Sequence, residues 1–233
     1  MRSVVVGASG GIGRALVLAL LARGDEVHAL SRRPIAIDGA VSRGGVDVMD
    51  EETIAAAATK IAQFGPVDLV VVATGLLGAD GISPEKTFRA LDPASFAHLF
   101  AVNATGPALV AKHFVPLLPK TGRCVFAALS ARVGSISDNR LGGWYGYRAS
   151  KAALNQILRT LAIEVGRSRR EAIVLGLHPG TVATELSSPF RRADAEGVFS
   201  PDVAAGHLLA VVDGATVEQS GRVLAWDGTT VPA

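Results

Sequence analysis

The sequence predicts an α/β fold in which a doubly wound, mostly parallel sheet of seven strands lies between two layers of helices. Short runs rich in Val and Leu alternate with longer runs rich in Ala and Leu along most of the chain. Hydrophobic residues make up 49% of the 233 residues and aromatic residues only 5%, which suits buried parallel strands and the helices that cover them. No change of composition divides the chain, so residues 1–233 are expected to form a single domain.

The expected strands are short and apolar, and they span residues 4–6, 26–30, 46–48, 67–72, 123–129, 172–177 and 222–226. The expected helices span residues 11–23, 51–64, 92–118, 145–165 and 201–212. Gly24 follows the first helix, and Asp92-Pro93 offers a capping side chain and a proline to the first turn of the third. That third helix is expected to break near Gly106-Pro107. Residues 184–200 are irregular, and ligands bind beyond the carboxyl ends of such strands, so we expect the substrate loop there.

The charge balance and the cysteine and histidine content exclude several classes of function. The 23 basic and 21 acidic residues give a net charge of +2, which offers no electrostatic reason to expect nucleic acid or an anionic membrane as partner. A single cysteine, Cys124, forms no disulfide within the chain, and the five histidines are too dispersed to predict a metal site. We find neither a signal peptide nor an apolar run of transmembrane length, and we expect a cytoplasmic protein.

A glycine-rich turn follows the first strand and opens the first helix. Glycines at such a turn let the backbone approach a pyrophosphate, and the helix N-terminus offers N–H groups and a partial positive charge. A plain turn between a strand and a helix needs fewer glycines than the four present here. The residues expected to bind a dinucleotide here are Gly7, Ser9, Gly10, Gly11, Ile12 and Gly13.

The end of the second strand indicates which dinucleotide is bound. A carboxylate at this position would accept hydrogen bonds from the ribose 2′-hydroxyl of NAD, but the chain continues Ser31-Arg32-Arg33. Paired guanidinium groups suit the 2′-phosphate of NADP, although paired arginines are also common in solvated loops. The missing carboxylate favours NADP, with Ser31, Arg32 and Arg33 around the phosphate.

Tyr147 and Lys151 place a phenol and an ammonium four residues apart, on one face of the helix expected over 145–165. A nearby lysine cation favours the phenolate, which would lower the pKa of the tyrosine from about 10. A phenol so adjusted exchanges a proton with a carbonyl or alcohol oxygen. Tyr145 has Ala149 at the same spacing and therefore lacks such a partner.

Two motifs together carry a family resemblance: Gly-x-x-x-Gly-Ile-Gly at residues 7–13 and Tyr-x-Ala-Ser-Lys-Ala-Ala-Leu at residues 147–154. They resemble the short-chain dehydrogenase/reductase family, which has a Rossmann-like fold, and the likeness extends over nearly the whole chain. The loop 130–151 and the ending at residues 225–232 look closest to its C-factor and carbonyl-reductase-like branch.

The resemblance implies roles for individual residues of the catalytic set. Tyr147 would be the acid/base, and Lys151 would also bind the nicotinamide ribose. Ser130, at a strand end, would polarise the substrate oxygen, but it lies 17 residues before Tyr147 where the family commonly has about thirteen, so Ser135 and Ser137 are rivals. Asn103 matches the helix asparagine whose local helix break exposes a carbonyl that anchors a water next to the lysine.

The resemblance also extends the set of residues around the cofactor. Asp47 and Val48 would border the adenine, although Asp47 equally suits a helix cap near Glu51. After the next strand the family often has Asn-Asn-Ala-Gly, and this chain has Val72-Ala73-Thr74-Gly75, which retains the glycine but neither amide. Ala73, Thr74 and Gly75 are expected to border the cofactor. The segment after the sixth strand would border the nicotinamide through Pro179, Gly180, Val182 and Thr184, and His178 is expected to be a packed residue there.

These observations predict an NADP-dependent oxidoreductase of a small carbonyl or alcohol substrate. The family further implies a homodimer or homotetramer. Two alternatives remain open: an NADP-binding regulatory or signalling protein with weak or no turnover, and a dehydratase or epimerase that uses the same tyrosine. Leu186, Phe190 and Phe199 either line an apolar substrate pocket or pack the loop down.

Overall fold

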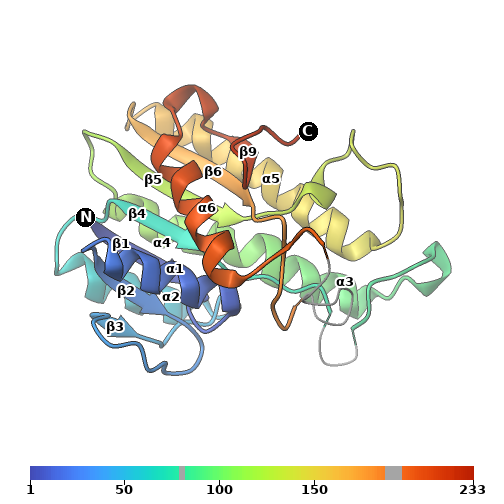
Figure 1. The fold of residues 1–233 in the computed structure, drawn as a ribbon, viewed down its shortest axis with the longest axis horizontal. Coiled ribbons are helices and arrows are strands. Elements are labelled where there is room, and N and C mark those ends of the chain that lie inside the picture. The colour runs from blue at the N-terminus through green and yellow to red at the C-terminus, as the bar shows by residue number, and fades with distance from the viewer. Residues whose placement is uncertain (79–81, 187–195) are drawn as a thin grey trace.

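A computed structural model describes residues 1–78, 82–186 and 196–233 (Figure 1). Its strands are β1 (Arg2–Val6), β2 (Glu26–Leu30), β3 (Ser42–Arg43), β4 (Leu69–Val72), β5 (Cys124–Leu129), β6 (Ala172–His178), β7 (Thr181–Val182), β8 (Val198–Phe199) and β9 (Arg222–Ala225). Its α-helices are α1 (Gly11–Ala22), α2 (Glu51–Ala62), α3 (Pro93–Phe100), α4 (Gly106–Phe114), α5 (Tyr145–Gly166) and α6 (Pro201–Gly214).

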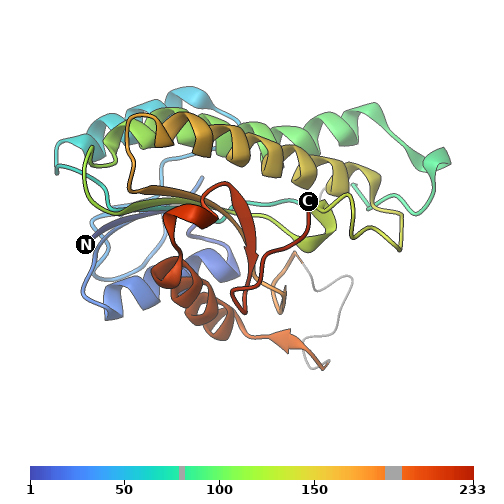
Figure 2. The same ribbon diagram turned by 90° about the horizontal axis from the view of Figure 1, so that it is seen from above.

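Seven strands in the described part of the chain form one sheet in the order β3-β2-β1-β4-β5-β6-β9, and every neighbouring pair is parallel. Figure 2 shows the sheet edge-on, with α2, α4 and α5 over one face and α1 and α6 over the other. Strand side chains alternate between the two faces: Val4 and Val6 pack toward the α2/α4/α5 layer, and Val5 packs toward α1 and α6. The predicted fold class, a doubly wound sheet of seven strands, is confirmed.

The strand expected at residues 46–48 is wrong. The chain pairs with β2 earlier, through Ser42–Arg43, and then passes through Gly44 and Gly45, which have φ angles of +98° and +85°. Such left-handed residues end an extended strand, because successive residues can no longer alternate between the two faces of the sheet. Val46 and Val48 are nevertheless buried, and they pack the loop before α2 against the core. Their apolar side chains are the pattern that predicted a strand.

The helix expected over residues 92–118 is divided into α3, a π-helical segment (Ala101–Thr105), α4 and a 3-10 turn (Val115–Leu117). The break comes just before Gly106-Pro107, where the sequence places it. Pro107 has no N–H, so it does not donate the α-helical hydrogen bond that the carbonyl of Asn103, four residues earlier, would otherwise accept. Asn103 therefore lies at the irregular turn of a layer that packs against the sheet.

In the described residues, the run Pro93–Leu117 is the one helix long and apolar enough to span a membrane by length and composition. This finding differs from the expectation that no apolar run of the chain reaches transmembrane length. Val110, Ala111 and Phe114 of this run are buried in the core against the sheet, which accounts for their apolar character.

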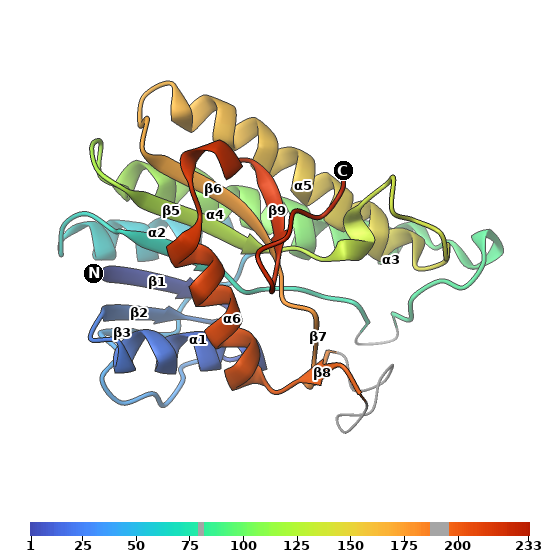
Figure 3. The same cartoon turned by 45° about the horizontal axis from the view of Figure 1, so that its top comes forward.

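The segments β7 and β8 were not anticipated, because strands of two residues leave no pattern in a sequence. They pair in parallel and lie beyond the carboxyl ends of the central strands, next to the start of α6 (Figure 3). β8 falls within the region expected to be the irregular substrate loop, and residues 187–195 of that region lie outside the described residues.

The glycine turn itself is close-packed. A Cβ added to Gly13 would lie 2.1 Å from the carbonyl oxygen of Gly7, and one added to Gly7 would lie 2.9 Å from the backbone of Ala73 and Thr74. Gly7 also has a φ of +93°, which favours glycine. The turn therefore requires glycine at both positions, for space at Gly13 and for space and conformation at Gly7.

We expect Gly13→Ala to lower the free energy of unfolding by about 2 kcal/mol or more, because the new methyl group overlaps a backbone atom that has no room to move. Gly10→Ala is the matched control, since its Cβ would lie at an ordinary contact distance of 3.5 Å from the same oxygen. Urea unfolding of both variants measures the difference. Equal stabilities of the two variants would contradict this account of the turn.

Candidate active site

Tyr147 and Lys151 lie in the first turns of α5, on the face that looks toward the carboxyl ends of the central strands. Tyr147 is half-buried, and Lys151 is buried. The Nζ atom of Lys151 donates a hydrogen bond of 2.8 Å to the carbonyl of Leu129, the last residue of β5, and lies 5.8 Å from the centroid of the Tyr147 ring. The predicted pairing of phenol and ammonium on one helix face is therefore present.

Burial shifts the pKa values of these two groups in opposite directions. It raises the pKa of Tyr147 to about 12 and lowers the pKa of Lys151 to about 8. The expected lowering of the tyrosine pKa by the lysine is therefore wrong for the chain by itself. Loss of hydration dominates and raises this pKa. The ammonium of Lys151 lies over the tyrosine ring and donates its hydrogen bond to Leu129. The phenol holds its proton at neutral pH, which is the form that a general acid needs.

Ser130 follows β5 directly and is buried beside α5. Its hydroxyl donates a hydrogen bond of 2.5 Å to Oδ1 of Asn155, and its backbone N–H donates to Leu177 of the neighbouring strand. Asn155 was not predicted, although it lies four residues after Lys151 and so continues the face that carries Tyr147 and Lys151. Ser130 thus stands where β5 ends, next to the face that carries this pair.

The two rival serines, Ser135 and Ser137, make their hydrogen bonds within the loop after β5 and to the end of the chain. The hydroxyl of Ser135 donates to the backbone oxygen of Ala233 at 3.3 Å and accepts from the N–H of Asp138. The hydroxyl and N–H of Ser137 also donate to Ala233. Both serines therefore tie the loop after β5 to the end of the described chain, and the geometry favours Ser130 as the hydroxyl beside α5.

Asn103 is fully buried and connects three segments. Its Nδ2 donates to the carbonyl of Leu76 at 2.7 Å and to Oγ of Ser150 at 3.1 Å, and its Oδ1 accepts from the N–H of Leu76 at 2.8 Å. Ser150 in turn donates to the carbonyl of Tyr147. The side chain of Asn103 thereby joins the π-helical segment, the loop after β4 and the first turns of α5.

The segment after β4 brings the glycine turn and the Tyr147/Lys151 pair to the same place. Gly7 packs against Ala73 and Thr74, while a Cβ added to Gly75 would lie 3.7 Å from Nζ of Lys151 and 3.8 Å from Oδ1 of Asn103. Leu186 also reaches this point, at 3.9 Å from the same Cβ position, as expected for an apolar wall of the site. Ala73 stands where the family pattern has its second amide, and Thr74 stands where it has alanine. The buried hydroxyl of Thr74 has no hydrogen-bond partner in the described residues.

The first turn of α1 is suited to an anion. No side chain caps the helix at Gly10, and its first turn contains no acidic residue, so the N–H groups that lack an intrahelical acceptor meet no negative charge of the chain. Ser9, Gly10 and Gly11 are exposed. A Cβ added to Gly11 would clash with the methyl group of Thr184, which places Thr184 at the same turn.

Arg32 and Arg33 are exposed after β2, and no acidic side chain in the described part of the chain lies within ion-pair distance of either. Ser31 is buried, and its hydroxyl donates to the carbonyl of Arg33, which fixes the start of this loop. Two unpaired guanidinium groups in this place fit a phosphate ligand.

Asp47 accepts a hydrogen bond from the N–H of Met49, while Asp50 caps α2 by accepting from Glu52. The alternative that Asp47 caps this helix is therefore wrong. Val48 is buried against Gly106 at the start of α4, which places both residues on the turn between β3 and α2.

Pro179 and Gly180 follow β6 and lead into β7, whose Val182 is buried. Gly180 has a φ of +76°, and a Cβ there would meet the rings of Phe199 at 2.9 Å and Trp226 at 3.1 Å. Phe199 thus packs the segment down rather than lining a substrate pocket. Burial lowers the pKa of His178 to about 4, in keeping with a packed residue.

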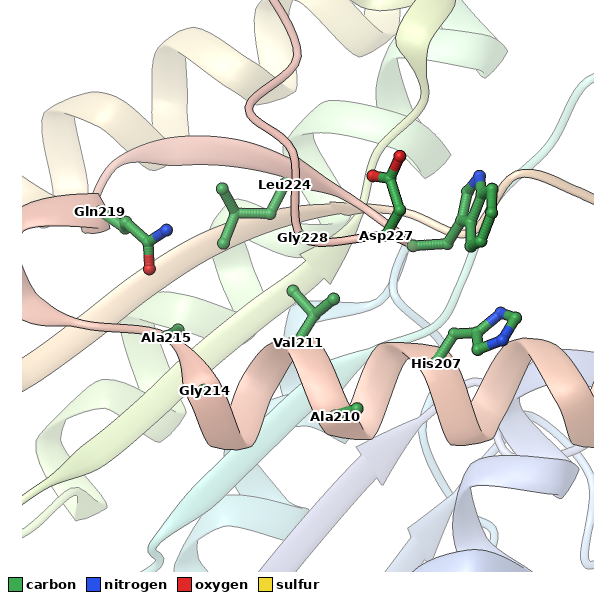
Figure 4. A pocket seen from close by; sticks show the side chains of 10 residues that line it. His207, Ala210, Val211, Gly214, Ala215, Gln219, Leu224, Asp227 and Gly228 are labelled. Atoms are coloured by element: carbon green, nitrogen blue, oxygen red, sulfur yellow. The ribbon is translucent and has the colours of Figure 1, made fainter.

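A cavity of about 420 Å³ lies between α6 and β9, lined by residues that include His207, Val211, Leu224 and Asp227 (Figure 4). None of its lining residues belongs to the predicted site. Phe190, which the sequence analysis named with Leu186 and Phe199, lies outside the described residues.

Residues 2–195 match the family model of the short chain dehydrogenases. This chain belongs to the short-chain dehydrogenase/reductase family. It is 33% identical over 230 residues to 1-hydroxy-2-glutathionyl-2-methyl-3-butene dehydrogenase of Rhodococcus sp. (strain AD45), covering 97% of this chain and 96% of that protein. It is 36% identical over 169 residues to the C-signal of Myxococcus xanthus, covering 72% of this chain and 93% of that protein.

Among solved structures, NADPH-bound carbonyl reductase from chicken fatty liver matches with a TM-score of 0.85 and 25% identity, covering 100% of this chain and 94% of that one. The resemblance drawn from the two sequence motifs is therefore confirmed, and the chain is an oxidoreductase of this family.

Replacing Lys151 by Met is expected to change how stability depends on pH. Burial lowers the lysine pKa from 10.5 to about 8, so the unfolded chain binds more protons than the folded one between these values. The free energy of unfolding of the wild type therefore rises with pH across this window, by up to about 3 kcal/mol, and Lys151→Met lacks the rise.

Urea unfolding at several pH values between about 7 and about 10 measures this difference. Lys60→Met, at an exposed lysine of α2, is the control and should follow the wild type. Parallel curves for the wild type and Lys151→Met would show that the lysine pKa is not lowered by folding.

Proposed function

We propose that this chain transfers a hydride between NADPH and a small carbonyl or alcohol substrate, with Tyr147 as the general acid/base. The observation that carries the proposal is the meeting of Tyr147, Lys151 and Ser130 at the carboxyl end of β5, one short segment away from a glycine turn suited to an anion. Membership of an oxidoreductase family and the likeness to an NADPH-bound carbonyl reductase support it.

The residues around the glycine turn fit a phosphorylated dinucleotide. The turn has an uncapped helix N-terminus and backbone that only glycine permits, and Arg32 and Arg33 carry no ion pair in the described residues. These groups would hold the pyrophosphate and the 2′-phosphate, and Lys151, Pro179, Gly180, Val182 and Thr184 would hold the nicotinamide end. When bound, NADPH supplies the hydride.

The chain's own groups would manage the proton and the developing charge. In the reductive direction Tyr147 donates its phenolic proton to the substrate oxygen. Because its pKa is raised to about 12, the phenol carries this proton at neutral pH. The hydroxyl of Ser130 turns its hydrogen from Asn155 toward the same oxygen and stabilises its negative charge. Lys151 adds positive charge below about pH 8 and stabilises the phenolate that remains.

A regulatory NADP-binding protein is the other candidate, and the 36% identity to the C-signal is the observation that favours it. It requires cofactor binding without turnover. The retained Tyr147, Lys151 and Ser130 favour the enzyme, because binding alone does not need an acid beside the site.

The first test is oxidation of NADPH by the wild type against a panel of aldehydes and ketones, followed at the reduced nicotinamide. We expect Tyr147→Phe to lower kcat by about 100-fold or more, because the proton donor is removed, while the affinity for NADPH is retained. Tyr145→Phe is the matched control: it lies one half-turn earlier on the same helix, is exposed and should keep wild-type kcat. Wild-type turnover by Tyr147→Phe would reject the assignment, and NADPH binding with no turnover on any carbonyl would favour the regulatory protein.

The choice of cofactor has a separate test. We expect Arg32→Ala combined with Arg33→Ala to weaken NADPH binding by about 10- to 100-fold and to leave NADH binding unchanged, because only the 2′-phosphate loses its partners. Arg167→Ala, at an exposed arginine after α5, is the control. Titration of each protein with both nucleotides by fluorescence measures the two dissociation constants. Equal losses for NADPH and NADH would contradict a 2′-phosphate site.

A further inference from the structure

The helix that carries Tyr147 begins without a cap of its own. Trp144 occupies the position before α5 in the left-handed conformation, with φ 54° and ψ 45°, and its side chain makes no capping hydrogen bond. It is the one non-glycine residue in the described part of the chain with a positive φ. This conformation costs about 1–2 kcal/mol, so the surrounding structure has to hold it.

Glu85, which lies between β4 and α3, supplies the missing acceptors. Its Oε2 accepts a hydrogen bond of 3.1 Å from the N–H of Gly146, and its backbone carbonyl accepts one of 2.5 Å from the N–H of Trp144. The side chain is buried, with 5% of the residue exposed. A carboxylate in this place also meets the partial positive charge at the N-terminus of α5.

The space around this carboxylate is closely fitted. A Cβ added to Gly146 would lie 2.9 Å from Oε1 of Glu85 and 2.7 Å from Cδ1 of Leu99 on α3. Gly146 therefore lets the carboxylate reach the helix between α3 and α5. Oε1 itself has no hydrogen-bond partner in the described residues, so the carboxylate is buried at an energetic cost that its single side-chain bond only partly offsets. A carboxylate kept at such a cost calls for a role besides stability.

That role is suggested by what the capped turn carries. The ring of Trp144 meets the ring of Tyr147 edge to face, with 6.3 Å between their centroids, and Arg148 closes the turn by donating its N–H to the carbonyl of Trp144. The backbone of Trp144 and Gly146 that Glu85 holds therefore directly precedes Tyr147 in the first turn of α5. A shift of this turn would move the phenol while leaving the distant glycine turn in place.

We infer that Glu85 is a positioning residue: by capping α5 from outside the helix, it fixes Trp144 and Gly146 and so sets the orientation of the Tyr147 phenol. This inference rests on the proposed function for its effect on turnover. Its effect on Trp144 is independent of that function.

The experiment compares Glu85→Ala with Glu85→Gln. Gln keeps a side-chain oxygen that accepts from Gly146, whereas Ala removes it. Asp50→Ala is the matched control, because Asp50 is a carboxylate that caps α2, a helix that carries none of the proposed site residues. For each protein we would measure thermal unfolding, kcat, KM, the dissociation constant of NADPH and, in a Trp226→Phe background, the emission of Trp144, which is then the only tryptophan.

We expect Glu85→Ala to lower kcat by about 10- to 100-fold, with KM and the NADPH dissociation constant changed by less than about threefold, and to shift the emission of Trp144. Glu85→Gln should restore both kcat and emission. Asp50→Ala should lower the unfolding temperature without changing either. Should Glu85→Ala fail to fold, Glu85→Asp, which is one methylene shorter, takes its place and should show the same changes to a smaller degree.

Wild-type kcat and emission in Glu85→Ala or Glu85→Asp would overturn the inference. Equal losses of kcat in Glu85→Ala and Asp50→Ala would do so as well, because they would reduce the effect to general stability. If the wild type reduces no carbonyl, the proposed function fails, yet the inference still stands or falls on whether Trp144 emission changes in Glu85→Ala and returns in Glu85→Gln.

Discussion

The hydrogen bond from Lys151 to the carbonyl of Leu129 fixes the relation between the helix α5 and the sheet. It joins the end of a central strand to the helix face that carries Tyr147. The bond from Ser130 to Asn155 repeats the link one residue after the strand and one helical turn further along α5. Because both bonds are buried or half-buried, breaking either leaves a polar group without a partner. The strand therefore determines where the phenol and the serine hydroxyl stand relative to each other.

A second constraint is the space that glycine leaves at the carboxyl edge of the sheet. Gly7 allows the backbone after β4 to pass in contact with the turn, and Gly75 then lies beside Lys151 and Asn103. A side chain at Gly7 would separate the two halves of the site. The departure from the family pattern at Ala73 and Thr74 leaves this contact intact, because it is made by backbone atoms, and it leaves a buried hydroxyl on Thr74 without a partner in the described residues.

The sequence was sufficient to predict the parts of the fold and the site that have local causes. The alternation of strands and helices, the break ahead of Pro107 and the pairing of Tyr147 with Lys151 all follow from spacing within one element. The strand expected at residues 46–48 was wrong because buried valines in a loop look like those of a strand, while the left-handed Gly44 and Gly45 before them end the extended conformation. Glu85 and Asn155 were missed for different reasons: Asn155 lies on a face already identified, whereas Glu85 acts 61 residues away in sequence, where no local pattern reports it.

The opposite pKa shifts of Tyr147 and Lys151 indicate how the site is set for proton transfer. Loss of hydration penalises whichever form is charged, so it favours the neutral phenol and the neutral amine together. A site that lowered the tyrosine pKa below neutrality would hold mostly phenolate at neutral pH and would have little proton to give to a carbonyl. Here the proton stays on the phenol at neutral pH, and the lysine, with a pKa of about 8, keeps most of its charge. In the proposed function this charge would stabilise the phenolate once the proton has left. In the proposed function, burial of this pair would favour the reductive direction, in which the phenol must carry its proton before the substrate oxygen becomes negative.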